Sequence, residues 1–372
     1  MAMRLSAALL LALAAAGTSS SRLPPPTTPF RLYAPRASSV IVKPLPTPFG
    51  GGWGAVPMAK DPAAPGYWNA SVAGMRPGDF YVFTVDGTDR VDPSGLDISK
   101  DSKFSIVPAP YKWRNARKVV KPADSVIYEM QVGSFTPAGT LASAAAKLPY
   151  LAELGITVVE LMPIMHYCGP ADSWGYCPRA PYAVRPELGG SYGLKAFVDA
   201  AADLNMSVAI DIVWNHAAGD SVLVNYDTPS DGTNCHDEKG ECGTYFAHGA
   251  PEMTPWGPRP NFADVNIRAW IVDQLRLLID EFHIGSFRWG TCSRSLSSSL
   301  MKLKRKRLHR QHRLHPAGRG QARRQRLQRG QQRRLEAHAG GQRHVARGRA
   351  GRHLHGGGGH LGLALRGDHR RG

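Results

Sequence analysis

Val208-Ala209-Ile210-Asp211-Ile212-Val213-Trp214-Asn215-His216 has the composition of a β-strand that is buried on both faces. Five of its first six residues are apolar, and β-branched valine and isoleucine predominate. Asp211 interrupts the apolar run, and Asn215 and His216 follow its end. A carboxylate inside such a strand costs free energy unless a polar group meets it there. Two interpretations are therefore open: a core strand with one hydrogen-bonded Asp, or a strand whose carboxyl end carries a functional site.

The sequence pattern changes at about Asp124. From Asp124 the pattern alternates between strand and helix, which predicts a parallel sheet and an α/β fold. We expect strands at 125–135, 156–161, 208–213 and 284–289, and helices at 141–154, 192–204 and 267–282. A long loop, 165–191, and an irregular excursion, 217–263, separate them, and loops of that length are usually functional.

The segment from Phe30 to about Pro108 predicts a small antiparallel β-sandwich. Its short β-type runs alternate with Gly, Pro and Asp turns. The expected strands are 30–33, 39–42, 67–72, 80–85 and 103–106.

The first 21 residues resemble a secretory signal peptide. Arg4 supplies the positive start, 7–16 the short apolar run, and Ala14-Ala15-Ala16 a small-residue cleavage region. We therefore expect a secreted protein, or one in the lumen of the secretory pathway or an organelle. No later run is long enough to span a membrane.

Export would allow disulfides to form. Cys168 and Cys177 bracket one loop and Cys235 and Cys242 another, leaving Cys292 unmatched. The sequence favours these two local bridges over free thiols. No Cys/His spacing resembles a zinc site.

Several ordered motifs resemble glycoside hydrolase family 13, the α-amylase superfamily. Asp211-Ile212-Val213-Trp214-Asn215-His216 resembles the D-x-V-x-N-H signature that ends the third barrel strand of that family. The other matching motifs are 128–135, Leu154-Gly155-Ile156, Glu160-Leu161-Met162-Pro163 and Trp174-Gly175-Tyr176. The resemblance covers roughly residues 30–290. Its nearest branch is that of 1,4-α-glucan branching enzyme and maltooligosyltrehalose trehalohydrolase.

This resemblance implies a TIM-type (β/α)8 barrel, of which residues 124–290 form only the first half. Residues 125–290 number 166, against roughly 250 for a whole barrel. Residues 29–108 resemble the immunoglobulin-like domain that precedes the barrel in branching enzymes, mainly through Phe30-Arg31-Leu32-Tyr33-Ala34-Pro35.

The family cleaves α-glycosidic bonds with retention, using a carboxylate nucleophile and a second carboxylic acid about 5 Å away. By resemblance, Tyr176 stacks on the sugar that is cleaved, and His216 bonds to its hydroxymethyl group. Asp211 orients the site, and Arg288 fixes the nucleophile through a charge-assisted pair. The implied partner is an α-glucan or malto-oligosaccharide. Asn215 is a calcium ligand in many amylases, although branching enzymes generally need no ion. Apart from calcium at Asn215, we expect no cofactor.

The sequence departs from the family where the nucleophile belongs. His283-Ile284-Gly285-Ser286-Phe287-Arg288-Trp289-Gly290 stands where the family typically has H-I-D-G-F-R-W-D, so Gly290 occupies the nucleophile's position. Glycine offers no nucleophile. We therefore expect a member of an α-glucan-active enzyme family that is itself catalytically incompetent.

The residues after Gly290 carry no barrel pattern. Residues 301–372 contain 21 Lys and Arg against Glu336 and Asp368, and no Phe, Tyr, Trp or Ile. The charge of +17 is therefore a property of this tail, since the first 300 residues sum to −2. Such a segment is expected to be disordered. Translation of a GC-rich gene in the wrong frame explains it better than an RNA-binding tail, which would carry base-stacking aromatics.

Two other functions stay open from the sequence: a non-catalytic glucan-binding protein, and a basic nucleic-acid binder acting through the tail. We expect no specific nucleic-acid partner.

Overall fold

The computed structural model describes residues 27–47, 53–228, 242–247 and 253–289. The signal-like segment, Cys235, Gly290 and the basic tail lie outside the described residues.

The N-terminal region forms two antiparallel sheets. The first has the order β1 (Thr27–Tyr33), β5 (Tyr67–Ala73), β4 (Ala59–Lys60). The second has the order β3 (Val56–Pro57), β2 (Val40–Pro44), β6 (Phe80–Val85), β9 (Ser105–Ile106), β8 (Asp97–Ile98), and β7 (Thr88–Arg90) also pairs with β6. Alternate residues such as Leu32, Val42 and Phe83 are buried, because successive side chains of a strand point to opposite faces. The five predicted β-runs are confirmed as strands, in the predicted antiparallel arrangement.

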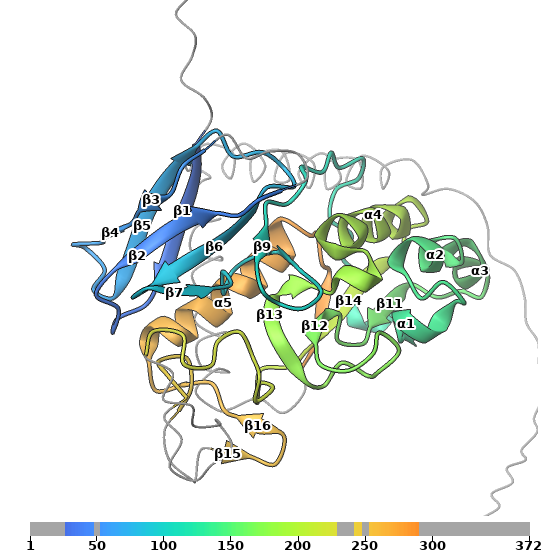
Figure 1. The fold of residues 1–372 in the computed structure, drawn as a ribbon. Helices are drawn as coiled ribbons and strands as arrows, with labels where there is room; N and C mark the ends of the chain where they lie inside the picture. The colour runs from blue at the N-terminus through green and yellow to red at the C-terminus, as the bar shows by residue number, and fades with distance from the viewer. Residues whose placement is uncertain (1–26, 48–52, 229–241, 248–252, 290–372) are drawn as a thin grey trace, which may run out of the picture. The chain divides into compact units, whose positions relative to one another are not determined.

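The second region contains a four-stranded parallel sheet, as its alternating pattern predicts. Its order is β10 (Ile127–Met130), β11 (Val158–Leu161), β14 (Ser207–Ile212), β17 (Ser286–Trp289), and each strand pairs with the next in sequence. Helix α4 (Gly190–Asp203) connects β11 to β14, and α5 (Val265–Asp280) connects β14 to β17 (Figure 1). All six residues of β14 are buried, which confirms the interpretation of this stretch as a core strand.

Two predicted elements are divided in the structure. The predicted strand 125–135 ends at Met130, and residues Val132–Phe135 form the helical turn α1, which Gln131 caps through a bond from Ser134 N. The predicted helix 141–154 forms α2 (Leu141–Ala145) and α3 (Leu148–Glu153) instead. Pro149 lies in the first turn of α3, where its missing N–H is tolerated, but it cannot continue a helix from α2.

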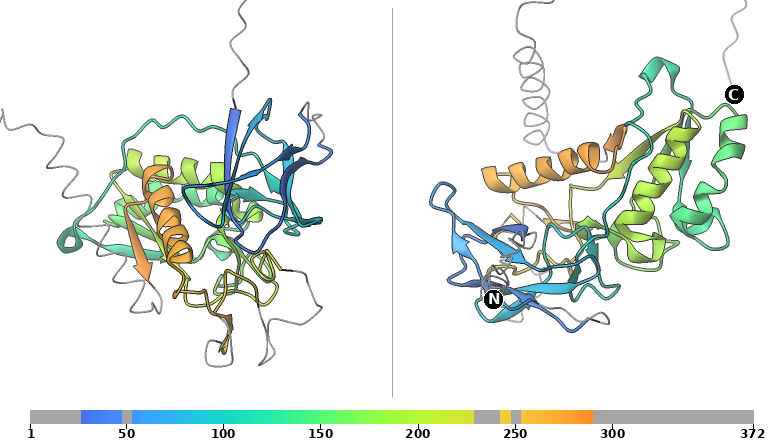
Figure 2. Two further views of the ribbon diagram at one scale, coloured as in Figure 1. Left: turned by 90° about the vertical axis from the view of Figure 1, so that its left-hand side faces the viewer. Right: turned by 90° about the horizontal axis from the view of Figure 1, so that it is seen from above.

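Both predicted irregular segments contain short elements. The loop 165–191 holds the hairpin β12 (Met165–Tyr167) and β13 (Pro178–Val184), followed by the 3-10 turn η2 (Pro186–Leu188). The excursion 217–263 holds the small hairpin β15 (Met253–Thr254) and β16 (Gly257–Pro258). A further 3-10 turn, η1 (Pro122–Asp124), precedes β10. The loop 165–191 and the excursion 217–263 follow the carboxyl ends of β11 and β14, where the chain leaves the sheet (Figure 2).

The two regions share one hydrophobic core. Buried tyrosines hydrogen-bond across the boundary: Tyr245 Oη donates to Tyr33 O at 3.0 Å, and Tyr226 Oη donates to Val91 O at 3.0 Å. Trp270 Nε1 donates to Ser94 Oγ at 2.8 Å. The N-terminal region therefore packs directly against α5 and against the excursion that follows β14.

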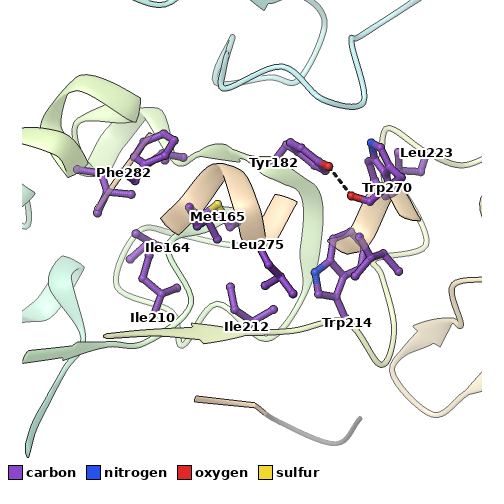
Figure 3. Close-up of a cluster of buried hydrophobic side chains, with 14 of the residues drawn as sticks. Ile164, Met165, Tyr182, Ile210, Ile212, Trp214, Leu223, Trp270, Leu275 and Phe282 are labelled. Carbon is purple, nitrogen blue, oxygen red and sulfur yellow. Dashed lines mark hydrogen bonds between the residues drawn. The ribbon is translucent and has the colours of Figure 1, made fainter. Parts of the chain in front are cut away.

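The residues just after β14 are anchored on α5. The Trp214 ring packs edge-on against Trp270 with centroids 5.4 Å apart, and Trp214 Nε1 donates to the buried Gln274 Oε1 at 2.8 Å. Figure 3 shows Trp214 and Trp270 beside Ile212, Leu223 and Leu275, with Tyr182 Oη bonded to Trp270 O. Asn215 and His216 follow Trp214 directly, so this packing also fixes their backbone.

Within the described ranges, we find no helix with the length and apolar content that a membrane span requires.

Candidate functional site

Asp211 and Arg288 lie opposite one another at the carboxyl end of the parallel sheet. Asp211 is on β14, Arg288 is on β17, and the register of the two strands pairs them directly. Side chains of paired residues in parallel strands leave the same face of the sheet. Arg288 Nη1 hydrogen-bonds to Asp211 Oδ2. The Asp211 side chain is fully buried, whereas that of Arg288 is 43% exposed.

Tyr176 completes a three-residue cluster from the loop above. Its hydroxyl donates to Asp211 Oδ2 at 2.6 Å and accepts from Arg288 Nη1 at 2.7 Å. Burial raises the pKa of the Tyr176 phenol to about 12, and the hydrogen bond to Asp211 acts in the same direction. The hydrogen bond from Arg288 to Asp211 raises the pKa of the Arg288 guanidinium. At neutral pH the phenol of the cluster is therefore neutral and its guanidinium is charged.

The second oxygen of Asp211 has no hydrogen-bond partner among the described residues. Asp211 Oδ1 is buried, and a cavity of about 10 Å³ beside it is lined by Pro163, Gly175, Ile212 and Trp214, among others. A cavity of that volume holds about one water molecule. Buried polar atoms are nearly always satisfied, so Oδ1 is placed to accept from a water molecule in that cavity.

His216 is tied to the same loop. Its Nε2 is 2.8 Å from Tyr176 O, and because a carbonyl only accepts, Nε2 carries the proton. Its Nδ1 is 3.1 Å from Asn215 Oδ1. Burial lowers the pKa of the His216 imidazole, and the hydrogen bond to Tyr176 O opposes that effect. His216 is therefore neutral at pH 7 and positions the backbone of Tyr176.

The loop that carries Tyr176 is closed by a disulfide. Cys168 and Cys177 are bonded, which confirms the first predicted bridge. Cys242 is also disulfide-bonded, while its predicted partner Cys235 lies outside the described residues. Gly175 has a φ of +84°, and a Cβ there would lie 2.5 Å from Pro163 O. Glycine is therefore required immediately before Tyr176.

A buried arginine and a glutamine hold the rest of this loop. Arg185 Nη1 donates to Tyr167 O at 2.8 Å, and Nη2 donates to Gly169 O at 2.8 Å, with the guanidinium 4.2 Å from the Tyr167 ring centroid. Gln131 Nε2 donates to Ser173 O at 2.8 Å and to Ala171 O at 3.2 Å. Arg185 and Gln131 thus hydrogen-bond to four carbonyls in and beside this loop. Because these bonds hold the loop, they also fix the position of the Tyr176 hydroxyl.

Glu160 and Trp174 stand in motifs that resemble the family, but the sequence assigned no role to them or to Trp256. Glu160 Oε1 is 3.8 Å from Arg288 Nε, and burial together with repulsion from Glu129 raises the Glu160 pKa. The sequence does carry one signal for Glu160, because a charged residue stands inside the apolar run Val158–Leu161. Trp174 and Trp256 are 70% and 64% exposed, and the Trp256 ring lies 5.8 Å from that of His216. Their place beside the site depends on how the loops fold back, which no local pattern shows.

Calcium binding at Asn215 stays a prediction from the family resemblance. No group of three or more His, Cys, Asp or Glu within the described ranges is arranged to hold a metal ion. Calcium takes six to eight oxygen ligands, and the Asn215 side chain lies 3.1 Å from His216 Nδ1. No chemical step is therefore assigned to a metal.

The arrangement combines the groups that recognise polyhydroxyl ligands: an acceptor carboxylate, a charged donor and exposed aromatic rings beside it. Residues 100–277 match the family model described as alpha amylase, catalytic domain. The chain is 32% identical to a malto-oligosyltrehalose trehalohydrolase of Saccharolobus solfataricus over 70% of this chain and 43% of that protein. It is 31% identical to the trehalohydrolase of Deinococcus radiodurans, over 58% of this chain and 34% of that protein.

A solved Salmonella typhimurium protein that is designated an alpha amylase superposes with a TM-score of 0.59. It is 31% identical, and the superposition covers 73% of this chain and 44% of that one. The chain belongs to the α-amylase family. It spans less than half the length of these three relatives, so what they do as whole proteins does not transfer directly.

Proposed function

We propose that the cluster of Tyr176, Asp211, His216 and Arg288 is an α-glucan site that binds one glucosyl unit without cleaving it. The observation that carries this proposal is the hydrogen-bonded Tyr–Asp–Arg group at the carboxyl end of a parallel sheet, in which the Arg288 side chain is 43% exposed. Parallel α/β folds place their sites at that end. The exposed edge of Arg288 donates to a sugar oxygen, and the buried Asp211 holds Arg288 and the Tyr176 hydroxyl in position for that contact.

The absence of cleavage follows from the residue after β17. The family's mechanism needs a carboxylate there, and Gly290 has none. The first half of a barrel, preceded by an immunoglobulin-like sandwich, is our interpretation of the fold. It is supported by four consecutive parallel strands and by two antiparallel sheets. Within such a half barrel, binding and bond cleavage are separated, because the residues that bind precede residue 290.

The test is calorimetric titration of the full chain with maltotetraose, with cellotetraose as the control ligand. Binding with a Kd on the order of 1 mM is expected for maltotetraose alone. Asp211→Asn should weaken it at least about tenfold, since Arg288 then loses the charged partner that holds it in position. Asp273→Asn is the matched control, because Asp273 is exposed and forms only a surface pair with Arg276. No binding, or equal binding by Asp211→Asn, refutes the site, and reducing ends released above the blank refute the lack of cleavage.

The trehalohydrolase relatives suggest a more specific ligand. A malto-oligosyltrehalose of equal length should bind at least as well as the malto-oligosaccharide if this half of the site recognises the glucan part. A strong preference for the linear malto-oligosaccharide would argue for a branching-type relative instead.

Export is also proposed. The disulfide Cys168–Cys177 supports an oxidising compartment, since such bonds are rare in reducing ones. Expression of the full chain in secreting cells, followed by N-terminal sequencing of the medium fraction, should show cleavage near residue 21. Retention of the uncleaved chain inside the cells would contradict export.

A further inference from the structure

Two short segments of the chain have the Asn-x-Ser pattern that accepts N-linked sugars in exported proteins. They are Asn69-Ala70-Ser71 and Asn205-Met206-Ser207. The first lies on β5 of the N-terminal region, and the second joins α4 to β14. The pattern only makes the modification chemically allowed, and the folded chain presents the two segments differently.

The first segment runs along a solvent-facing side of a sheet. β5 lies between β1 and β4 in the first antiparallel sheet (Figure 1). Successive side chains of a strand point to opposite faces, so Asn69 and Ser71 share one face. Trp68 and Val72 share the other face and are buried, whereas Ser71 is exposed and Asn69 is partly exposed. The amide and the hydroxyl of the segment therefore stand together on the outer side of the sheet.

An open pocket of about 630 Å³ lies over this outer side of the sheet. Its lining includes Asn69 and Ser71 of β5 together with Pro29 and Arg31 of β1. The strand register pairs Arg31 with Asn69 and Pro29 with Ser71, and both β1 residues are exposed. A pocket of this volume accommodates a small organic molecule, so a sugar attached at Asn69 has room beside the sheet.

The Asn69 amide keeps one N–H for modification. An asparagine side chain carries two N–H donors on Nδ2. Asn69 hydrogen-bonds to Asp61, and this bond lowers the pKa of the Asp61 carboxyl. Arg31 Nη2 lies 3.6 Å from Asp61 Oδ2 on the same side of the sheet. N-glycosylation replaces only one of the two hydrogens, so the modified amide still has a donor for Asp61.

The second segment is partly taken up by the core. Met206 and Ser207 are 1% and 2% exposed, and Ser207 Oγ donates to Lys118 O at 3.0 Å. Asn205 is exposed, but its Oδ1 accepts from Lys118 Nζ at 3.0 Å. The hydroxyl that the acceptor pattern requires is therefore withdrawn into the fold, where Ser207 begins the buried strand β14.

We propose that Asn69 is an N-glycosylation site and that Asn205 is not. The donor is an oligosaccharide carried on a lipid pyrophosphate and delivered by a transferase of the secretory lumen. Asn69 Nδ2 forms a bond to the anomeric carbon of the oligosaccharide, and the bond from that carbon to the pyrophosphate oxygen breaks. The lipid pyrophosphate leaves with the electron pair, and one Nδ2 proton passes to a base of the transferase. This proposal rests on the export proposed above and not on the glucan site.

Enzymatic removal of the glycan tests the modification. The full chain is produced in secreting eukaryotic cells in two forms, one unaltered and one with the leader of a known secreted protein placed before Met1. Peptide N-glycosidase should shift both forms by one step on a denaturing gel, and peptide mass spectrometry should find the asparagine at position 69 converted to aspartate. An unmodified lumenal chain of the second form overturns the site. An unaltered chain that never reaches the lumen overturns its natural use.

Variants of the second form identify the modified residue. Asn69→Gln and Ser71→Ala should each abolish the shift, whereas Ser71→Thr should retain it, because a threonine hydroxyl also completes the pattern. Asn205→Gln is the matched control and should leave the shift complete. If Asn69→Gln does not fold, the two Ser71 variants decide, since both change an exposed side chain. A shift that survives Ser71→Ala, or that Asn205→Gln removes, overturns the assignment. None of these measurements uses glucan binding, so the glucan site can fail without affecting them.

Discussion

Asp211 and Asp92 each accept a hydrogen bond from a tyrosine, and they differ in what else surrounds them. Asp211 accepts from Tyr176 at 2.6 Å and is paired with Arg288. Asp92, in the antiparallel region, accepts from Tyr81 at 2.8 Å and from Ser94 N at 2.7 Å, and forms no ion pair with a described residue.

The two aspartates differ because Asp211 is paired with a cation, Arg288, and Asp92 is not paired with a described cation. Burial raises the pKa of Asp92 to about 6, against the hydrogen bonds from Ser94 and Tyr81. At the sheet end the guanidinium of Arg288 shares the Asp211 charge and leaves one carboxylate oxygen unpartnered. The same Tyr–Asp pair is thus a structural contact in one region and part of the proposed glucan site in the other. The following predictions test that contrast in decreasing order of expected effect.

Removing the cation of the site should have the largest effect. Arg288→Ala leaves Asp211 as a buried charge, and breaking such a pair costs about 3–5 kcal/mol of unfolding free energy. Arg276→Ala, which breaks an exposed Arg–Asp pair, should cost at most about 1 kcal/mol. Denaturant unfolding of both variants measures this. The double variant Arg288→Ala/Asp211→Asn should recover part of the loss, and no recovery would show that the charge is not the cause.

The unpaired aspartate should appear in the pH dependence of stability. Between the ordinary value of 3.8 and about 6, the unfolded chain has ionised Asp92 while the folded chain has not. Stability should therefore fall as pH rises from about 4 to about 6, by up to roughly 3 kcal/mol, and then level off. Thermal unfolding across this range is the measurement. Asp92→Asn should remove that component, whereas Asp273→Asn should leave it, and an unchanged slope in Asp92→Asn would contradict the assignment.

The loop that carries Tyr176 should depend on Arg185. Arg185→Ala removes two charge-assisted bonds to carbonyls and should cost about 2–3 kcal/mol. It should also lower the Tyr176 pKa from about 12 toward the ordinary value, because the phenol is no longer held against Asp211. Ultraviolet titration, with Tyr176→Phe as the blank for that phenol, follows this change. A large loss of stability without any change in the titration would limit Arg185 to packing.

Removing one hydroxyl from each pair should have the smallest effect. Tyr176→Phe and Tyr81→Phe should each cost about 1–2 kcal/mol, since a hydrogen bond to a charged or buried acceptor is lost. The two should differ in glucan binding, which only Tyr176→Phe is expected to weaken. Equal weakening by both variants would show that the effect reaches the site through the fold.

Much of this arrangement can be predicted from sequence because the signals are local. Alternation of side chains predicts the strands of the sandwich, and an apolar run with one charge predicts β14. The closely spaced Cys168 and Cys177 predict their own bridge. The prediction of one helix at 141–154 is wrong, because the structure has two helices there. Pro149 cannot continue a helix from α2, and this outweighs the apolar periodicity of its neighbours.

Residue types and their order along the chain identify Asp211, His216, Tyr176 and Arg288, because each stands at the end of a recognisable apolar run or motif. Their mutual contacts arise from strand register and loop packing, which bring Arg288 against Asp211 and the carbonyl of Tyr176 against His216. The same is true of Arg185, whose sequence neighbours give no sign that it holds two carbonyls of a distant loop turn. Local propensity has the range of a few residues, whereas these hydrogen bonds join residues 16 to 77 positions apart. Only the packed sheet and its loops can supply that proximity.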